Sequence, residues 1–126
     1  MTVVAIAVLQ RDEHFLVGVR PVGVPLAGLH EFPGGKVRPG EAPGEAALRE
    51  CREETGYEAE LLHQWLVQVH KYDHGNVELH FFACRPVTEV SDAELAGKGF
   101  FWAARRELSQ LRFPDGNAEM LALLIP

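Results

Sequence analysis

One segment, residues 42–55, carries the strongest helix signals in the chain and constrains the fold more than any other. Pro43 stands in its first turn, and good helix-forming residues run from 45 to 54. Gly56 follows the segment, at the position where many helices end on a left-handed residue. The sequence therefore predicts a helix over residues 42–55.

Acidic side chains occupy one face of this predicted helix. Glu50, Glu53 and Glu54 are spaced i, i+3 and i+4, and like charges at that spacing destabilise an isolated helix. Arg49 lies four residues before Glu53, so it can orient the acids but cannot neutralise all three. We expect something in the folded protein to compensate their charge. The face expected to pack inward comprises Ala47, Leu48, Cys51 and Thr55, and Glu45 and Arg52 point to solvent.

A loop with paired glycines, residues 32–36, precedes the helix and reads Phe-Pro-Gly-Gly-Lys. The glycines allow backbone conformations that are closed to other residues, and they let carbonyl groups come close to a ligand. Oxygen-rich sites of this kind suit Mg²⁺ or Mn²⁺. Loop and acidic face together indicate a site for a divalent cation. The alternative is an acidic helix face that is only solvated.

The net charge of the chain is −6, and most of it lies in one stretch. Residues 41–60 hold seven acidic and two basic residues, which is a net charge of −5. Such a surface repels nucleic-acid backbones and acidic membranes unless a cation intervenes. The charge therefore predicts that neither a nucleic-acid polymer nor a membrane is the partner.

The length of 126 residues is that of one compact domain, and we expect residues 1–126 to form it. With 47% apolar and 24% charged residues, the chain can bury a core without disulfides. Cys51 and Cys84 lack CxxC spacing and are predicted to be buried thiols. The N-terminal segment has neither a basic start nor an apolar run of spanning length, which favours a cytoplasmic location.

The other elements are predicted from apolar runs, turn residues and a candidate helix cap. They are a strand pair at 3–9 and 15–19 with the first strand central, a structured loop at 21–39, a hairpin of strands 57–72 and 77–84 about residues 73–76, a polar connection at 89–99, a strand at 100–102, a helix at 105–111 and a helix at 117–124 that Asn117 can cap.

Residues 35–57 resemble the sequence box of the Nudix hydrolase family, G-x5-E-x7-R-E-U-x-E-E-x-G-U, in which U is a bulky aliphatic residue. Cys51 and Tyr57 stand at two U positions, where both can still pack. Strand, loop, box, hairpin and C-terminal helix also follow the family's order over nearly the whole chain. The fixed positions of the box are occupied by Gly35, Glu41, Arg49, Glu50, Glu53, Glu54 and Gly56.

This resemblance implies an α/β (α+β) fold, namely an α/β/α sandwich around a mixed β-sheet with the box as a loop–helix–loop. It implies hydrolysis of a nucleoside diphosphate linked to a further group X, with Mg²⁺ as cofactor and Mn²⁺ as a substitute. Arg49 would orient the carboxylates through charge-assisted hydrogen bonds, and Glu41 would stabilise the loop–helix–loop. The implied metal ligands are the Gly34 carbonyl, Glu50, Glu54 and Glu53, the last directly or through a bound water.

A nucleophilic water needs a base, and in MutT-type members of the family a carboxylate on a distal loop supplies it. The corresponding residues here are 89–99. Glu94 is the favoured candidate, with Asp92 and Glu89 as alternatives, and the competing interpretation is an acid that only solvates the loop. The implied catalytic residues are thus Glu53, Glu94 and Arg49.

Three further places resemble MutT-type enzymes, which hydrolyse oxidised purine nucleotides such as 8-oxo-dGTP. They are residues 30–37, where His30 stands in place of the usual Trp or Leu, residues 113–119, and Arg20, which matches an arginine that contacts the nucleotide. Asn117 can pair with the O6 and N7–H edge of 8-oxoguanine, whereas guanine has an acceptor at N7; its alternative role is the helix cap. The implied substrate-binding residues are Arg20, Phe32, Gly35, Lys36 and Asn117.

The expected reaction is hydrolysis of a nucleoside triphosphate to a nucleoside monophosphate and pyrophosphate, by attack of water at the β-phosphorus. An oxidised purine substrate would make the protein a nucleotide-pool sanitation enzyme that avoids mutation and supports DNA repair. Alternatives are ADP-ribose, a dinucleoside polyphosphate, CTP or dCTP, or a Nudix domain that binds a nucleotide without hydrolysing it, as a monomer or a homodimer.

Two features of the substrate pocket stay open at this point. MutT-type enzymes carry an arginine near the hairpin turn, where this chain has His74, Gly75 and Asn76. Large aromatic residues could line a base pocket, although each could equally belong to the core. These candidates are Phe32, Phe81 and Phe113.

Overall fold

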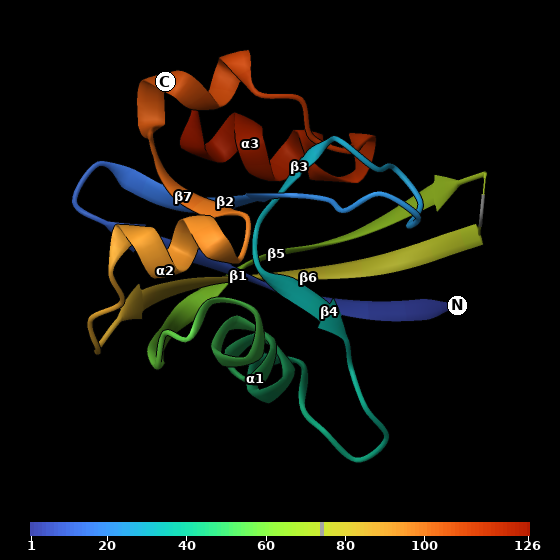
Figure 1. Cartoon of the computed structure of the whole chain (residues 1–126). Coiled ribbons are helices and arrows are strands. Elements are labelled where there is room, and N and C mark those ends of the chain that lie inside the picture. Colours follow the sequence, from blue (N-terminus) through green and yellow to red (C-terminus); the bar gives the residue numbers. More distant parts are fainter. Residues whose placement is uncertain (74) are drawn as a thin grey trace.

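A mixed β-sheet lies at the centre of the structure, with helices on both of its faces (Figure 1). The computed structural model describes residues 1–73 and 75–126. In chain order the elements are β1 (Thr2–Arg11), β2 (His14–Val19), β3 (His30–Glu31), β4 (Gly34–Lys36), α1 (Pro43–Thr55), β5 (Ala59–Tyr72), β6 (Gly75–Pro86), α2 (Asp92–Gly97), β7 (Phe100–Ala104), the 3-10 helices η1 (Arg105–Gln110) and η2 (Asp115–Asn117), and α3 (Ala118–Leu124).

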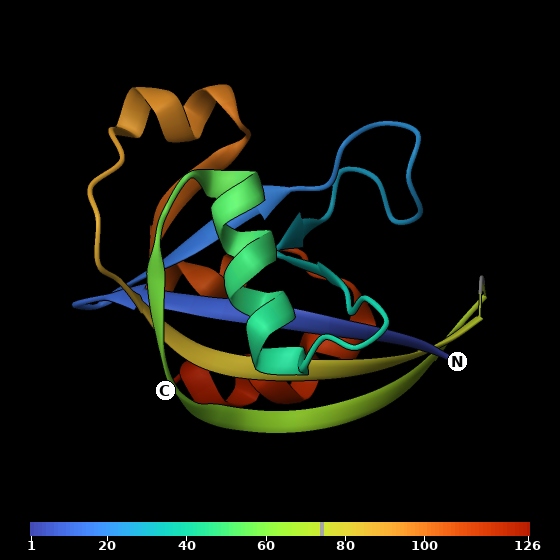
Figure 2. The ribbon, with the colours of Figure 1, turned by 90° about the horizontal axis from the view of Figure 1, so that it is seen from below.

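The strands pair in the order β3-β2-β1-β6-β5, while β4 pairs with β1 and β7 with β2. β1 runs parallel to β6 and antiparallel to β2 and β4, so the sheet is mixed. The prediction that the first strand is central and pairs with the second is confirmed. The observed architecture also confirms the expected sandwich, since α1 and α3 cover opposite faces of the sheet (Figures 1 and 2).

Side chains of β1 alternate between two apolar clusters, one on each face of the sheet. Ala5 and Leu9 pack in the cluster that includes residues of α1 and α2. Ile6 and Val8 pack in the other cluster, together with Met120 of α3. Because β1 is buried from both sides, its sequence is a continuous apolar run rather than an alternating one.

The helix predicted at 42–55 is confirmed as α1. The Glu45 carboxylate accepts a hydrogen bond from the Ala42 N–H at 2.9 Å and closes the first turn. Gly56 ends the helix with φ at 86°, and its N–H donates to the Arg52 carbonyl. The residues buried from this helix are Ala46, Ala47, Cys51 and Thr55, with Leu48 packed beside them.

The predicted hairpin is confirmed as β5 and β6, although its second strand begins closer to the turn than expected. Tyr72 pairs with Gly75, so β6 begins within the predicted turn at 73–76. The candidate turn residue His74 lies outside the described residues. Gly75 and Asn76, which stand where MutT-type enzymes carry an arginine, belong to β6.

Three predicted segments are present but differ in detail from the prediction. The polar connection predicted at 89–99 also contains the helix α2, in which the Ser91 hydroxyl accepts the Glu94 N–H and Leu95 is buried. The short helix predicted at 105–111 is present as the 3-10 helix η1 (Arg105–Gln110), a tighter form common in short pieces. The loop at 21–39 contains the short strands β3 and β4, which form through pairing with β2 and β1.

The C-terminal helix also begins differently from the prediction. The turn η2 precedes α3, and Asn117 has helical backbone angles, with φ at −90° and ψ at −4°. Its side chain does not cap α3 but donates from Nδ2 to the Pro114 carbonyl at 3.2 Å. The capping role proposed for Asn117 is therefore excluded, because the amide is turned back into the preceding turn.

The two cysteines are free, buried thiols, as predicted, and each lies in the cluster on the α1 face. Burial raises the pKa of Cys51 to about 11 and that of Cys84 to about 12. Among the helices of residues 1–73 and 75–126, none is long and apolar enough to cross a membrane.

Candidate functional site

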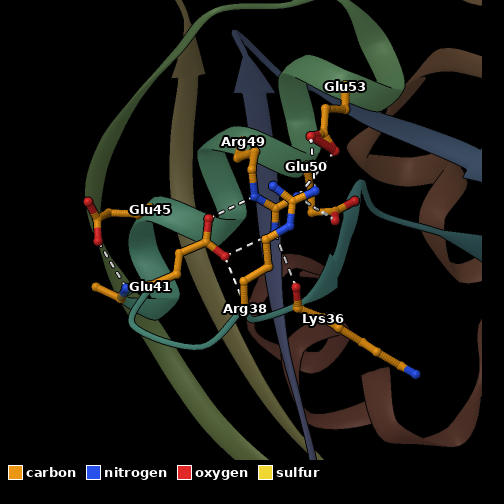
Figure 3. Close-up of polar contacts among 8 residues, drawn as sticks. Lys36, Arg38, Glu41, Glu45, Arg49, Glu50 and Glu53 are labelled. Carbon is orange, nitrogen blue, oxygen red and sulfur yellow. Dashed lines mark hydrogen bonds and ion pairs between the residues drawn. The ribbon is translucent and has the colours of Figure 1, made fainter.

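Arg49 lies within a network of carboxylates beside α1 (Figure 3). Its guanidinium donates to both oxygens of Glu41 at 2.7 and 3.0 Å, and to Glu50 and Glu53 at 2.8 and 3.1 Å. A further N–H reaches the Lys36 carbonyl at 3.2 Å. Arg49 thus provides part of the compensation expected for the acidic face, and it joins the helix to the preceding loop.

Glu41 is held from the loop as well as from the helix. Its carboxylate accepts a hydrogen bond from the Arg38 backbone N–H at 3.0 Å. The hydrogen bonds from Arg49 and from this N–H lower the pKa of Glu41 to about 2. The contacts of Arg49 with Glu41 and Glu50 in turn raise the pKa of Arg49. Glu41 therefore ties the loop to α1 and stays ionised.

The two glycines of β4 bring the backbone directly against the acidic side chains. A Cβ atom at Gly35 would lie 2.5 Å from Cδ of Glu50, and one at Gly34 would lie 2.5 Å from the Ala5 carbonyl oxygen. The Gly34 N–H points at Oε1 of Glu54, at 3.4 Å. Only glycine fits at these positions without displacing either the carboxylate or β1.

Glu54 is the most perturbed carboxyl of the site. Burial raises its pKa strongly, and the contact with Glu50 and the charges of Glu31 and Glu50 add to the effect. The Gly34 N–H acts in the opposite direction and is the weaker influence. Two carboxylates held this close repel each other unless a proton or a cation lies between them.

These residues fit a hard divalent cation, because they offer carboxylate oxygens beside glycine backbone. Among the described residues, no three carboxylate, imidazole or thiolate side chains converge on one point. Mg²⁺ tolerates this, since it usually binds through one or two carboxylates plus substrate phosphates and water. The structure brings Glu50 and Glu54 together, whereas Glu53 is turned toward Arg49 and Arg38, at 3.1 and 3.7 Å.

A cavity of about 460 Å³ opens beside these glycines. Part of its wall is apolar and comes from β1 and β6, including Ile6 and Leu79. Every residue that the sequence suggested for substrate binding lines it, although they come from three separate segments. These residues are Arg20, Phe32, Gly35, Lys36 and Asn117.

Arg20 is held in the cavity wall by two contacts. Its Nη1 lies 3.1 Å from the Glu31 carboxylate, and its Nε donates to the Pro25 carbonyl at 2.8 Å. Burial raises the pKa of Glu31, although Arg20 opposes that rise. The arginine therefore fixes the loop after β2 while it faces the cavity.

Asn117 is 8% exposed and borders the same cavity. Because the Pro114 carbonyl can only accept a hydrogen bond, the atom of the amide that faces it is Nδ2. The carbonyl Oδ1 is therefore the amide atom turned away from Pro114. An acceptor in this position suits a base edge that carries a proton.

The aromatic candidates occupy different places. Phe32 lines the cavity and is 4% exposed, and Phe81 is fully buried in the core. Phe113 packs on Phe32, with ring centroids 5.0 Å apart. His30 lies next to this pair, 6.1 Å from the Phe113 ring, and its buried Nδ1 has no hydrogen-bond partner among the described residues.

Glu94 and its alternatives Asp92 and Glu89 lie in or just before α2, and all three are exposed. The contact described at Glu94 is made by its backbone N–H, which donates to Ser91. Among the described residues, no hydrogen bond or ion pair joins these acids to Glu50 or Glu54. A base from this segment stays a prediction.

Glu31 and Tyr72 are among the cavity residues that the sequence did not suggest. Glu31 lies within the segment that resembles MutT-type enzymes, so that segment could have suggested it. Tyr72 lies in the hairpin and accepts a hydrogen bond from Gly116, which is 44 residues away. No local pattern indicates a contact of that kind.

Comparison with known proteins shows that the chain is similar to proteins named as pyrophosphohydrolases or diphosphatases. Residues 1–124 match the NUDIX domain family. A CTP pyrophosphohydrolase of Escherichia coli (strain K12) is 48% identical over 59 residues, which are 47% of this chain and 44% of that protein. The chain thus spans less than half the length of this relative. An 8-oxo-dGTP diphosphatase of Haemophilus influenzae is 31% identical over 75% of this chain and 69% of its own length.

The fold agrees with solved structures as well. The solution structure of a DNA mismatch repair protein MutT from methicillin-resistant Staphylococcus aureus, described as a Nudix hydrolase, superposes with a TM-score of 0.78. The two chains are 27% identical, and the match covers 98% of this chain and 95% of the other.

Proposed function

The chain belongs to the NUDIX domain family, and from that premise we propose that it is a Mg²⁺-dependent nucleoside triphosphate pyrophosphohydrolase. Residues 1–126 would form one such domain. The products would be a nucleoside monophosphate and pyrophosphate, formed by attack of water at the β-phosphorus. Hydrolysis rather than binding alone is favoured because every acid of the box is present.

The observation that carries this proposal is the position of the carboxylate pair. Glu50 and Glu54 contact Gly35 and Gly34, and the same two glycines line the cavity. A polyphosphate in the cavity would therefore lie next to two acidic groups that would repel it. Only a cation bound between them makes the arrangement favourable for a phosphate ligand.

We assign Glu50, Glu54 and the Gly34 carbonyl as metal ligands, with Glu53 as a ligand or as the holder of a bound water. When bound, Mg²⁺ would offset the charge that develops on phosphorus and on the leaving group. Mn²⁺, which accepts the same oxygen ligands, would substitute. Arg49 would keep the carboxylate oxygens oriented, because its hydrogen bonds leave them few alternative rotamers.

The attacking water requires a general base. We propose Glu94 for this role, with Asp92 and Glu89 as alternatives, because the segment is exposed and rich in acids. Lys36 lines the cavity and would contact the phosphate groups through its ammonium. Arg20, in the same wall, would contact the nucleotide with the part of its guanidinium that Glu31 does not occupy.

The favoured substrate is an oxidised purine nucleotide such as 8-oxo-dGTP, which would make this a nucleotide-pool sanitation enzyme. Asn117 supports this choice, since its Oδ1 is directed away from Pro114. That oxygen would accept the N7–H of 8-oxoguanine, whereas the N7 of guanine is an acceptor and would be repelled. The resemblance to 8-oxo-dGTP diphosphatases supports the same class.

A cytidine triphosphate is the second candidate. The local identity of 48% with a CTP pyrophosphohydrolase favours it. The amino group of cytosine is also a donor, so Asn117 Oδ1 could accept from it as well. The two candidates therefore differ in the size of the base rather than in the hydrogen bond that they require.

A panel of nucleotides assayed with Mg²⁺ decides between them. We expect kcat/KM for 8-oxo-dGTP to exceed that for dGTP by at least about 10-fold, as expected for a hydrogen bond replaced by repulsion. Equal values would remove the damage-specific function, and a preference for CTP or dCTP would establish the second candidate. ADP-ribose and a dinucleoside polyphosphate complete the panel.

The variant Glu54→Gln tests the site itself. It keeps the shape of the side chain but removes a charged ligand, and we expect pyrophosphate release to fall by about 100-fold or more. Glu58→Gln is the matched control, because Glu58 is exposed and lies 3.9 Å from Arg52, outside the site. Unchanged hydrolysis by Glu54→Gln would refute the assignment of the metal ligands.

A further inference from the structure

Tyr72, the last residue of β5, contacts the C-terminal turn of the protein. Its hydroxyl oxygen accepts a hydrogen bond from the Gly116 backbone N–H at 2.8 Å. Tyr72 and the turn are distant in the sequence, yet both border the cavity at which we place the nucleotide. The hydroxyl therefore joins the hairpin to the segment that carries Asn117.

The turn packs closely on this hydroxyl. A Cβ atom at Gly116 would overlap the Tyr72 hydroxyl and would lie 2.8 Å from Cδ1 of Leu79. Gly116 is buried, as is Pro114 on the other side of Asp115. There is consequently little room for η2 to shift toward β5, and the hydrogen bond opposes a shift away from it.

Asn117 follows Gly116 directly, so the position of this turn sets the position of the amide. The Asn117 backbone N–H donates to Pro114 at 3.0 Å, and its Nδ2 donates to the same carbonyl at 3.2 Å. These two bonds orient the amide within the turn but do not attach the turn to the sheet. The bond from Gly116 to Tyr72 makes that attachment.

We propose that Tyr72 is a positioning residue for base recognition: its hydroxyl holds η2 against the cavity so that the Asn117 amide meets the nucleobase. This role rests on the proposed nucleotide hydrolysis. It concerns the hydroxyl alone, because the aromatic ring of Tyr72 packs among core residues and would stay in place in a phenylalanine.

The variant Tyr72→Phe removes the hydroxyl and keeps the ring. Loss of one hydrogen bond lets η2 move, and we expect KM for the preferred nucleotide to rise by about 3- to 10-fold, more than kcat falls. The preference for 8-oxo-dGTP over dGTP should fall with it. An effect on folding alone would instead lower the yield of active enzyme and leave KM and the preference unchanged.

Tyr57→Phe is the matched control. The Tyr57 hydroxyl is also hydrogen-bonded, accepting from Trp102 at 3.2 Å and donating to the Val90 carbonyl at 3.3 Å. It belongs to the cluster on the opposite face of the sheet, away from the cavity. We expect this variant to lose stability without a change in KM or in base preference.

A double-variant cycle tests whether Tyr72 acts through Asn117. In an Asn117→Ala background, Tyr72→Phe should change KM and base preference by less than about 2-fold, because the recognising group is already absent. An effect of the same size in both backgrounds would overturn the proposed role.

Amide hydrogen exchange separates this inference from the proposed function. We expect the Gly116 amide to exchange about 10-fold faster in Tyr72→Phe than in the wild type, whatever the substrate is. An unchanged exchange rate would overturn the inference even if 8-oxo-dGTP is the substrate. If no nucleotide of the panel is hydrolysed, the proposed function fails, and calorimetric titration with 8-oxo-dGMP replaces KM in the same cycle.

Discussion

At the scale of single residues, Arg49 shows how the protein tolerates a face of like charges. Three carboxylates, Glu41, Glu50 and Glu53, accept hydrogen bonds from its guanidinium, while its side chain is 11% exposed. The planar group can make these bonds at once because its N–H groups point in several fixed directions. A lysine has the same charge but lacks this geometry.

Replacing this arginine tests the argument. We expect Arg49→Lys to lower kcat/KM by about 10- to 100-fold, since Glu50 and Glu53 lose the donors that orient them. Arg52→Lys is the control, because Arg52 is exposed and lies 3.9 Å from Glu58. Steady-state kinetics with the preferred nucleotide measure both. Equal activity of the two variants would contradict the orienting role of Arg49.

The two cysteines behave as core residues. Burial raises the pKa of Cys51 to about 11 and of Cys84 to about 12, so the reactive thiolate is nearly absent at neutral pH. We expect neither thiol to react with a thiol reagent in the native protein, and both to react after unfolding in denaturant. Rapid labelling of the native protein, read by mass spectrometry, would disprove their burial.

At the scale of elements, α1 depends on the residues at its two ends. Glu45 closes the first turn through the Ala42 N–H, and Gly56 ends the helix in a left-handed conformation. A Cβ at Gly56 has room, since its nearest contact is Val90 Cγ2 at 3.7 Å. A side chain at this position would therefore lower the free energy of unfolding only through the left-handed backbone conformation, since it would not clash with a neighbour.

The helix end yields a quantitative expectation. Gly56→Ala should lower the free energy of unfolding by about 1 to 2 kcal/mol, the cost of a left-handed L-residue. Gly97→Ala is the control, since Gly97 ends α2 without a positive φ and a Cβ there meets nothing within 4 Å. Urea unfolding measures both. A smaller loss in Gly56→Ala than in Gly97→Ala would be inconsistent with this account.

At the scale of the whole molecule, the sheet assembles the site from distant parts of the chain. β1 supports the glycines of β4 at one edge and pairs with β6 at the other, so the cavity lies across the sheet between the box and η2. The residues proposed to bind the metal and the residue proposed to recognise the base therefore belong to different segments and meet only in the folded protein.

Metal binding should consequently stabilise the entire fold. Mg²⁺ at about 100 times its Kd would add about 2.7 kcal/mol to the free energy of unfolding if it binds only the native state. We expect Tm to rise with MgCl₂ but not with KCl of equal ionic strength. The rise should disappear in Glu50→Gln/Glu54→Gln and persist in Glu58→Gln. Persistence in the double variant would place the metal elsewhere.

The acidic face of α1 and the glycines beside it were predictable from the sequence, because these residues lie close together along the chain. Spacing along a helix places Glu50, Glu53 and Glu54 on one face, and glycines next to that helix must approach it closely. The central strand was likewise predictable, since burial on both faces requires an unbroken apolar run. Local rules suffice where the period of a helix or strand alone decides which side chains share a face.

Tertiary structure decided what depends on distant contacts. Asn117 is a plausible helix cap by local rules, but the fold turns its amide onto Pro114 and anchors its turn through Tyr72. The pairing of Glu50 with Glu54, and the turning of Glu53 toward Arg49 and Arg38, depend equally on how the loop packs against the helix. In each case a side chain has alternative hydrogen-bond partners of similar strength. Which partner it takes depends on the packing of the folded chain.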